Sequence, residues 1–155
     1  MADNSAPHTG IQKTVGWSAL VVLIALYVVG AVSVPPGSLR HEVQTLPLWF
    51  PIVAGLQRRQ VAKWAALPCL IFWLAIMVSI WLFLLGWAQI VSGRFSRTEI
   101  AMTLVVGAAS ILGLSSAARE RTTVTPRLAV GLFVTFAVLQ VGAFWLSLVP
   151  YIAHR

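Results

Sequence analysis

The chain has 155 residues, of which 59% are hydrophobic and only 10% are charged. Soluble proteins carry about 25% charged residues, so the composition excludes an ordinary soluble domain. Eleven Lys and Arg residues against four Asp and Glu give a net charge of +7. The basic residues lie at the ends of apolar runs, which argues against nucleic-acid binding and is typical of residues that orient a membrane protein.

The first apolar run follows a polar N-terminal tail, residues 1–14. Thr14 can cap a helix over residues 15–34, which is long enough to cross a membrane. Prolines and a glycine at 35–37 end this helix. The alternative is a cleavable signal peptide with small residues before its cleavage site, but the run is long for such a segment. We therefore expect an uncleaved first transmembrane helix.

The next segment is the least regular part of the chain. Its apolar stretch, residues 46–56, is too short to cross a membrane, and Pro47 and Pro51 remove helical hydrogen bonds. We expect residues 46–63 to form an interfacial or re-entrant segment before the second transmembrane helix. The polar trio at residues 40–42, Arg-His-Glu, is interpreted as solvated rather than catalytic.

The second predicted transmembrane helix covers residues 65–91, which include no charged side chain. A helix of that length is about 40 Å long, more than the roughly 30 Å hydrocarbon core requires. The third predicted helix covers residues 98–118. Ser96 and Glu99 have the spacing of a capping box, so the helix should begin near this pair.

The fourth predicted helix covers residues 126–151, with Thr125 as its N-cap and Pro126 at its first position. The sequence thus predicts an all-α integral membrane protein, a bundle of four transmembrane helices. Residues 15–155 form its single transmembrane domain.

Two predicted helices carry side chains that favour close packing. Small residues recur every four positions on the third helix, at Ala109, Gly113 and Ala117. Large residues recur at the same spacing on the second helix, at Trp73, Met77 and Trp81. Small stripes let a second helix approach closely, so we expect the large stripe to pack on the small one. The alternatives are a face for another subunit, or an aromatic wall for a lipid, quinone or pigment.

Basic residues gather in two predicted loops. They are candidates for contact with anionic lipids or a partner: Arg58, Arg59, Lys63, Arg119, Arg121 and Arg127. With four spans, the distribution of Lys and Arg favours both termini outside; with five spans, the N-terminus would be inside. Both loops are cytoplasmic in either case.

The four apolar runs contain no Asp, Glu, Lys, Arg or His. Proton relays and ion-coupled transport usually need ionisable groups within the spans, and haem needs axial ligands there. We therefore expect no catalytic residue, cofactor or metal site. The leading hypothesis is a non-catalytic accessory, assembly or scaffold subunit of a bacterial inner membrane, which binds other subunits or itself. The alternative is a small oligomeric transporter or channel, with Gln140 and the proline-containing segment in its path.

Overall fold

The computed structural model describes residues 8–33, 39–89 and 95–149. Within these residues the chain is helical and forms no strand. Its helices are α1 (His8–Ser33), α2 (Arg40–Leu56), α3 (Val61–Leu84), α4 (Arg97–Arg119) and α5 (Pro126–Leu146). By length and composition, α1, α3, α4 and α5 can each cross a membrane. The chain is a membrane protein on that basis, and α2 is an additional, shorter helix.

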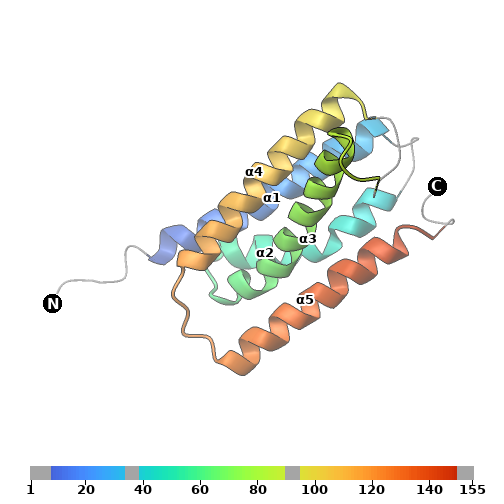
Figure 1. Ribbon diagram of the computed structural model, residues 1–155. Helices are drawn as coiled ribbons and strands as arrows, with labels where there is room; N and C mark the ends of the chain where they lie inside the picture. Colours follow the sequence, from blue (N-terminus) through green and yellow to red (C-terminus); the bar gives the residue numbers. More distant parts are fainter. Residues whose placement is uncertain (1–7, 34–38, 90–94, 150–155) are drawn as a thin grey trace.

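Successive helices run in opposite directions, as Figure 1 shows. The side chain of Ser18 on α1 lies beside Gly113 on α4, and the Ser33 hydroxyl donates to the Glu99 carboxylate, which makes α1 and α4 antiparallel. Lys63 at the start of α3 donates to the main-chain oxygen of Glu120 at the end of α4. The starts of α1, α3 and α5 therefore share one end of the bundle with the ends of α2 and α4.

The helices α1 and α2 touch through their backbones. A Cβ atom added to Gly55 would lie 2.7 Å from the Cα atom of Gly16. A Cβ atom added to Gly30, near the other end of α1, would lie 3.0 Å from the His41 ring. The helix α2 therefore runs antiparallel to α1 along nearly the whole of its apolar run.

Residues 46–56, the apolar part of the expected interfacial or re-entrant segment, lie in one continuous helix, α2, and residues 57–60 form the turn before α3. Both prolines of α2, Pro47 and Pro51, are buried inside it. They lie four residues apart and so remove hydrogen bonds on a single face. Neighbouring helices and polar side chains can satisfy the freed carbonyls of such a face.

Several helix boundaries differ from the predicted ones. The helix α1 begins at His8, within the predicted polar tail, and α3 begins at Val61 rather than at residue 65. The helix α3 ends at Leu84 rather than at residue 91, because Gly86 takes a φ of 74° and Trp87 donates to the oxygen of Leu82. The fourth predicted helix was expected to continue to residue 151, but α5 ends at Leu146; residues 150 and 151 lie outside the described residues.

The start of α4 agrees with the prediction. Ser96 is its N-cap and forms a reciprocal capping box with Glu99. Thr125 is the N-cap of α5, with Pro126 at the first position. These two starts were readable because the Ser96–Glu99 pair and Pro126 each lie within four residues of the boundary. The Thr125 side chain makes no capping hydrogen bond.

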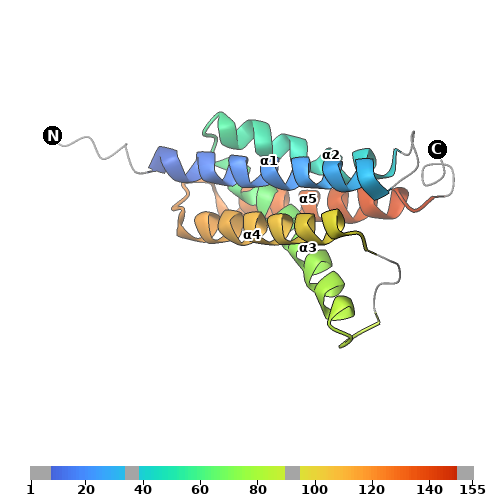
Figure 2. The same cartoon turned by 90° about the horizontal axis from the view of Figure 1, so that it is seen from above.

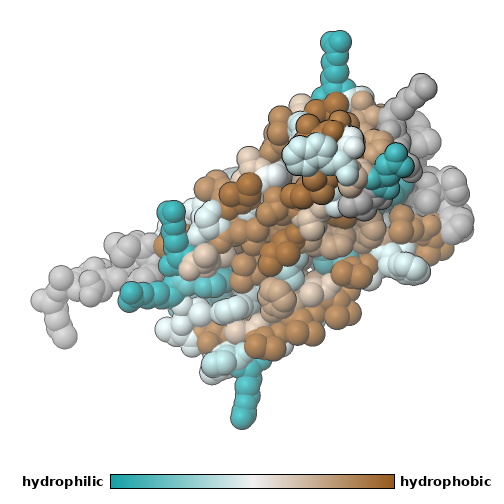
Figure 3. Space-filling view, in the orientation of Figure 1, coloured by the Kyte–Doolittle hydropathy of each residue, from teal (hydrophilic) through white to brown (hydrophobic). Residues whose placement is uncertain are grey.

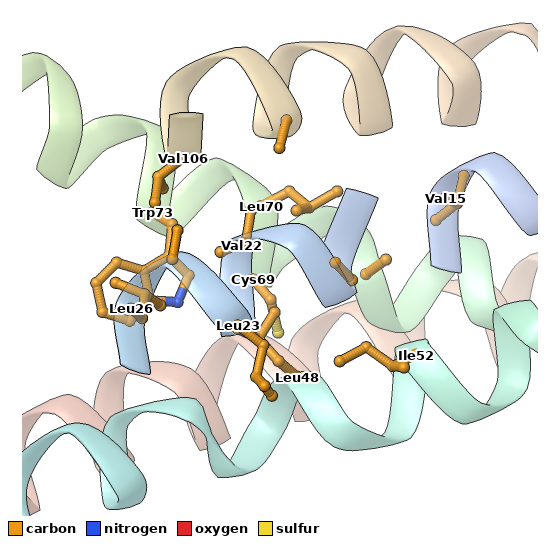
Figure 4. Packing of buried hydrophobic residues seen from close by; sticks show 14 of the residues in the cluster. Val15, Val22, Leu23, Leu26, Leu48, Ile52, Cys69, Leu70, Trp73 and Val106 are labelled. Atoms are coloured by element: carbon orange, nitrogen blue, oxygen red, sulfur yellow. The ribbon is translucent and has the colours of Figure 1, made fainter. Parts of the chain in front are cut away.

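Apolar side chains from all five helices meet in one core, to which α5 contributes Phe136; part of it is shown in Figure 4. Its fully buried members include Val15, Val22, Leu48 and Leu70. Figure 2 shows that α3 crosses the other helices obliquely. The second half of α3 therefore has fewer neighbours, and much of its surface lies open.

The contact between Gly16 and Gly55 predicts a position-dependent response to one methyl group. We expect Gly55→Ala to lower the free energy of unfolding by about 1–3 kcal/mol, because the new Cβ would overlap the backbone of α1. The matched control is Gly107→Ala, whose Cβ would meet no described atom within 4 Å. That change should be neutral or stabilising by up to about 1 kcal/mol, because alanine favours helix. Unfolding in mixed detergent micelles measures the free energy of unfolding of both variants. Equal changes would contradict the close contact between Gly16 and Gly55.

Candidate functional site

Basic side chains gather at the end of the bundle where α1 begins, which we call the arginine end. Its members in the described residues are Lys13, Arg58, Arg59, Lys63, Arg119, Arg121 and Arg127. The opposite end holds Arg40 and Arg97 among the described residues, while Arg94 and Arg155 lie outside them. In Figure 3 long hydrophilic side chains project near the ends of a mostly hydrophobic body.

Lys63 differs from the other five candidates for lipid or partner contact. Its side chain is buried, its Nζ atom donates to the main-chain oxygen of Glu120 at 2.6 Å, and it lies 5.2 Å from the centre of the Trp64 ring. It therefore joins α3 to the end of α4. The candidates whose side chains are exposed are Arg58, Arg59, Arg119, Arg121 and Arg127.

Arg58 holds a backbone conformation that favours glycine. Its φ is 58°, and the amides of Arg58 and Arg59 donate to the oxygens of Gly55 and Ala54. This is the hydrogen-bonding pattern that Gly86 completes at the end of α3. A side chain in this conformation costs about 1–2 kcal/mol relative to glycine. An arginine here keeps a positive charge at the arginine end despite that strain.

The small stripe of α4 packs inside the chain. Ala109, Gly113 and Ala117 are buried. A Cβ atom on Gly113 would lie 2.7 Å from Leu70 of α3 and 2.9 Å from Ser18 of α1. The stripe thus lets α1 and α3 approach α4 closely, so it is not an open face for another subunit.

The aromatic stripe of α3 meets α4 at a different level from the small stripe. Trp73 and Met77 are buried in the core, and Trp81 donates from its ring nitrogen to the Thr103 hydroxyl at 3.0 Å. Figure 4 places Trp73 beside Val106. Trp81 therefore binds α4 nearly three turns away from Gly113, and the smaller Ser18 and Leu70 occupy the stripe.

A buried polar cluster joins α2 to α5. Gln140, fully buried, donates to the main-chain oxygen of Gln44 at 3.1 Å. The Gln44 amide donates to the Ser147 hydroxyl at 2.8 Å, and that hydroxyl donates to the oxygen of Phe144. The Gln140 side chain thus has a main-chain carbonyl of α2 as its acceptor. Sequence reasoning missed Gln44 and Ser147, although a glutamine one turn before Pro47 in an apolar helix was a usable signal.

The trio at residues 40–42 lies at the end opposite the arginine end. The His41 ring packs against Gly30 of α1. The main-chain oxygen of Glu42 accepts a hydrogen bond from the Thr45 hydroxyl at 3.0 Å. Within the described ranges, no group of three His, Cys, Asp or Glu residues could hold a metal ion.

The outer face of α5 carries exposed residues, two of them glycines. Gly131, Thr135, Val138 and Gly142 are exposed and fall within about 60° of arc, opposite the buried Phe136 and Gln140. A Cβ atom at either glycine would meet no described atom within 4 Å. Hollows of about 520 and 570 Å³ flank Val138 and Gly142, and the larger extends to α2. We call these four residues the outer stripe.

Comparison with known proteins gives no relative: no family model, curated protein or solved structure matches the chain.

The burial of Lys63 predicts that it stabilises the fold. We expect Lys63→Met to lower the free energy of unfolding by about 1.5–3 kcal/mol, because a charge-assisted hydrogen bond to Glu120 is lost while the apolar stem is kept. Arg121→Met, at an exposed position of the same end, should change it by less than about 0.5 kcal/mol. Unfolding in mixed micelles measures the free energy of unfolding of both variants. Equal losses of stability would contradict a stabilising role for Lys63.

Proposed function

We propose that the protein is a non-catalytic membrane subunit that works by association, and that α5 forms the contact. The observation that carries this proposal is the outer stripe. The helix α5 packs against α2 and α3 on one face only, and 17% of its apolar window is buried, compared with 44% for α1.

The small residues of the outer stripe suit a transmembrane helix from another subunit. In lipid, helices associate through close backbone packing, and Gly and Thr at four-residue spacing permit it. Gly131 and Thr135 have this spacing, and Gly142 follows two turns later. The hollow between α2 and α5, lined by Leu46, Phe50 and Leu146, would receive the side chains of that helix.

The proposal includes an orientation in which all five helices cross the membrane. Support comes from the antiparallel course of α2 along α1 and from seven basic residues at the arginine end against two at the other, among the described residues. The side richer in Lys and Arg faces the cytoplasm. The arginine end would then lie at the cytoplasmic face of a bacterial inner membrane, where anionic lipids attract basic side chains. In this arrangement Lys13 lies on the same side of the membrane as the two basic loops, whereas the four-span arrangement places it on the opposite side.

Bulky substitutions on the outer stripe should break the association. We expect Gly131→Leu with Gly142→Leu to reduce the complexed fraction about tenfold or more, because overpacking an interface costs roughly 1–3 kcal/mol. The measurement is native mass spectrometry of the chain extracted gently from its own membrane at native abundance.

The matched control adds as many carbon atoms as the two leucines do, but at positions beside the outer stripe. Val130→Phe with Val141→Phe lies about a quarter turn away on the exposed surface of α5 and should leave the complex intact. A wild-type chain that is monomeric and without partners would contradict the proposal. A homo-oligomer that carries only lipid would instead favour the oligomeric transport alternative, in which solute flux into proteoliposomes would depend on Gln140.

Cysteine labelling tests the orientation. In a Cys69→Ala background, we expect Leu39→Cys and Arg97→Cys to react with a membrane-impermeant maleimide in intact cells. Gln57→Cys and Arg121→Cys should react only after permeabilisation, because they lie at the arginine end. All four positions are exposed. Labelling of Leu39→Cys and Gln57→Cys from the same side would show that α2 does not cross.

A further inference from the structure

A second groove, between α1 and α4, combines an apolar wall with basic residues at one end. Its volume is about 390 Å³, and its walls include Trp17 and Val21 on α1 and Val105, Ala108 and Leu112 on α4. The two helices lie side by side in Figures 1 and 2. No charged side chain lines it among the described residues.

The antiparallel pairing of the two helices sets the length of the groove. Ser18 lies level with Gly113, so the groove extends from the level of Thr14 to that of Val105. At 1.5 Å per residue this is about 18 Å. Half of a hydrocarbon core of roughly 30 Å is about 15 Å, so the groove matches the depth of one leaflet.

Two basic side chains lie at the arginine end of this groove. Lys13 precedes Trp17 by one helical turn, and Arg119 follows Leu112 by two turns on the same face of α4. Because α1 and α4 are antiparallel and Ser18 lies beside Gly113, Lys13 and Arg119 lie at about the same height along the bundle. Arg119 is exposed and Lys13 is partly exposed. Long basic side chains at helix ends reach the headgroup layer in this way.

A buried polar atom without a partner faces the same groove. Ser18 is 3% exposed and lines the groove, and its Oγ atom has no hydrogen-bond partner among the described residues. It lies five residues along α1 from Lys13, a rise of about 7.5 Å toward the membrane centre. A hydroxyl at this depth suits an ester carbonyl below a phosphate, and an unpartnered buried polar group is unfavourable.

We propose that the groove between α1 and α4 binds one phospholipid with an anionic headgroup. Lys13 and Arg119 bind its phosphate, the Ser18 hydroxyl donates to an ester carbonyl, and one acyl chain lies along Ala108 and Leu112. This site deepens the proposed attraction of the arginine end for anionic lipids and rests on that part of the proposed function. It requires neither a partner subunit nor a particular number of crossings.

The test counts lipids that stay bound to the purified full-length chain in native mass spectrometry. The probes are phosphatidylglycerol and phosphatidylcholine with identical acyl chains, supplied at equal concentration. We expect one phosphatidylglycerol to be retained preferentially. Lys13→Gln with Arg119→Gln should weaken its binding about thirtyfold, since each basic residue near the surface contributes roughly 1 kcal/mol.

Two matched controls separate a built site from diffuse attraction. Arg121→Gln with Arg127→Gln removes the same charge from the same end and should leave binding within about twofold. Ala108→Phe fills the groove and should abolish the preferential retention, whereas Ala118→Phe, exposed on another face of α4, should not. Equal losses in the two charge pairs, or full retention in Ala108→Phe, would overturn the site. Because the readout is lipid on a single chain, failure here would not affect the test of association.

Discussion

The contact between the backbones of Gly16 and Gly55 is the constraint on which the rest of the arrangement depends. It holds α2 along α1 in the opposite direction, so the short proline-containing helix returns the chain to the end where it began. Each later helix then runs in the direction opposite to the helix before it, and Arg58 and Arg59 lie at the end of the bundle where α1 begins. A side chain at either glycine would separate the helices and move the basic loop with them.

Polar groups inside the bundle are placed by partners on other helices rather than by local sequence. Gln140 on α5 meets a carbonyl of α2, and Lys63 on α3 meets a carbonyl at the end of α4. In lipid an unsatisfied polar group costs several kcal/mol, so each such bond selects one arrangement of the two helices. These bonds connect elements that the apolar core leaves less constrained, above all α5.

The sequence was sufficient where the deciding signal was local. The apolar runs revealed the four long helices, and Ser96 with Glu99 marked the start of α4. It was insufficient where tertiary contacts decided the outcome: Pro47 and Pro51 read as breaks, yet packing against neighbouring helices keeps α2 continuous. The six candidate contact residues were found as a group, but only the structure separates buried Lys63 from the exposed arginines. The small stripe of α4 was recognised from its four-residue spacing. That spacing does not determine how α1 and α3 align along α4, and this alignment places Ser18 and Leu70 against the stripe.

The cluster of Gln44, Gln140 and Ser147 has a consequence for the order of biosynthesis. Gln44 and Gln140 are separated by 96 residues. At 5–20 residues per second, the ribosome needs roughly 5–20 s to deliver the second glutamine after the first. During that interval the Gln44 side chain must bind water or the insertion machinery. The helix α5, made after the other four, therefore completes the hairpin of α1 and α2, and a chain truncated before α5 would leave the Gln44 side chain without its Ser147 partner.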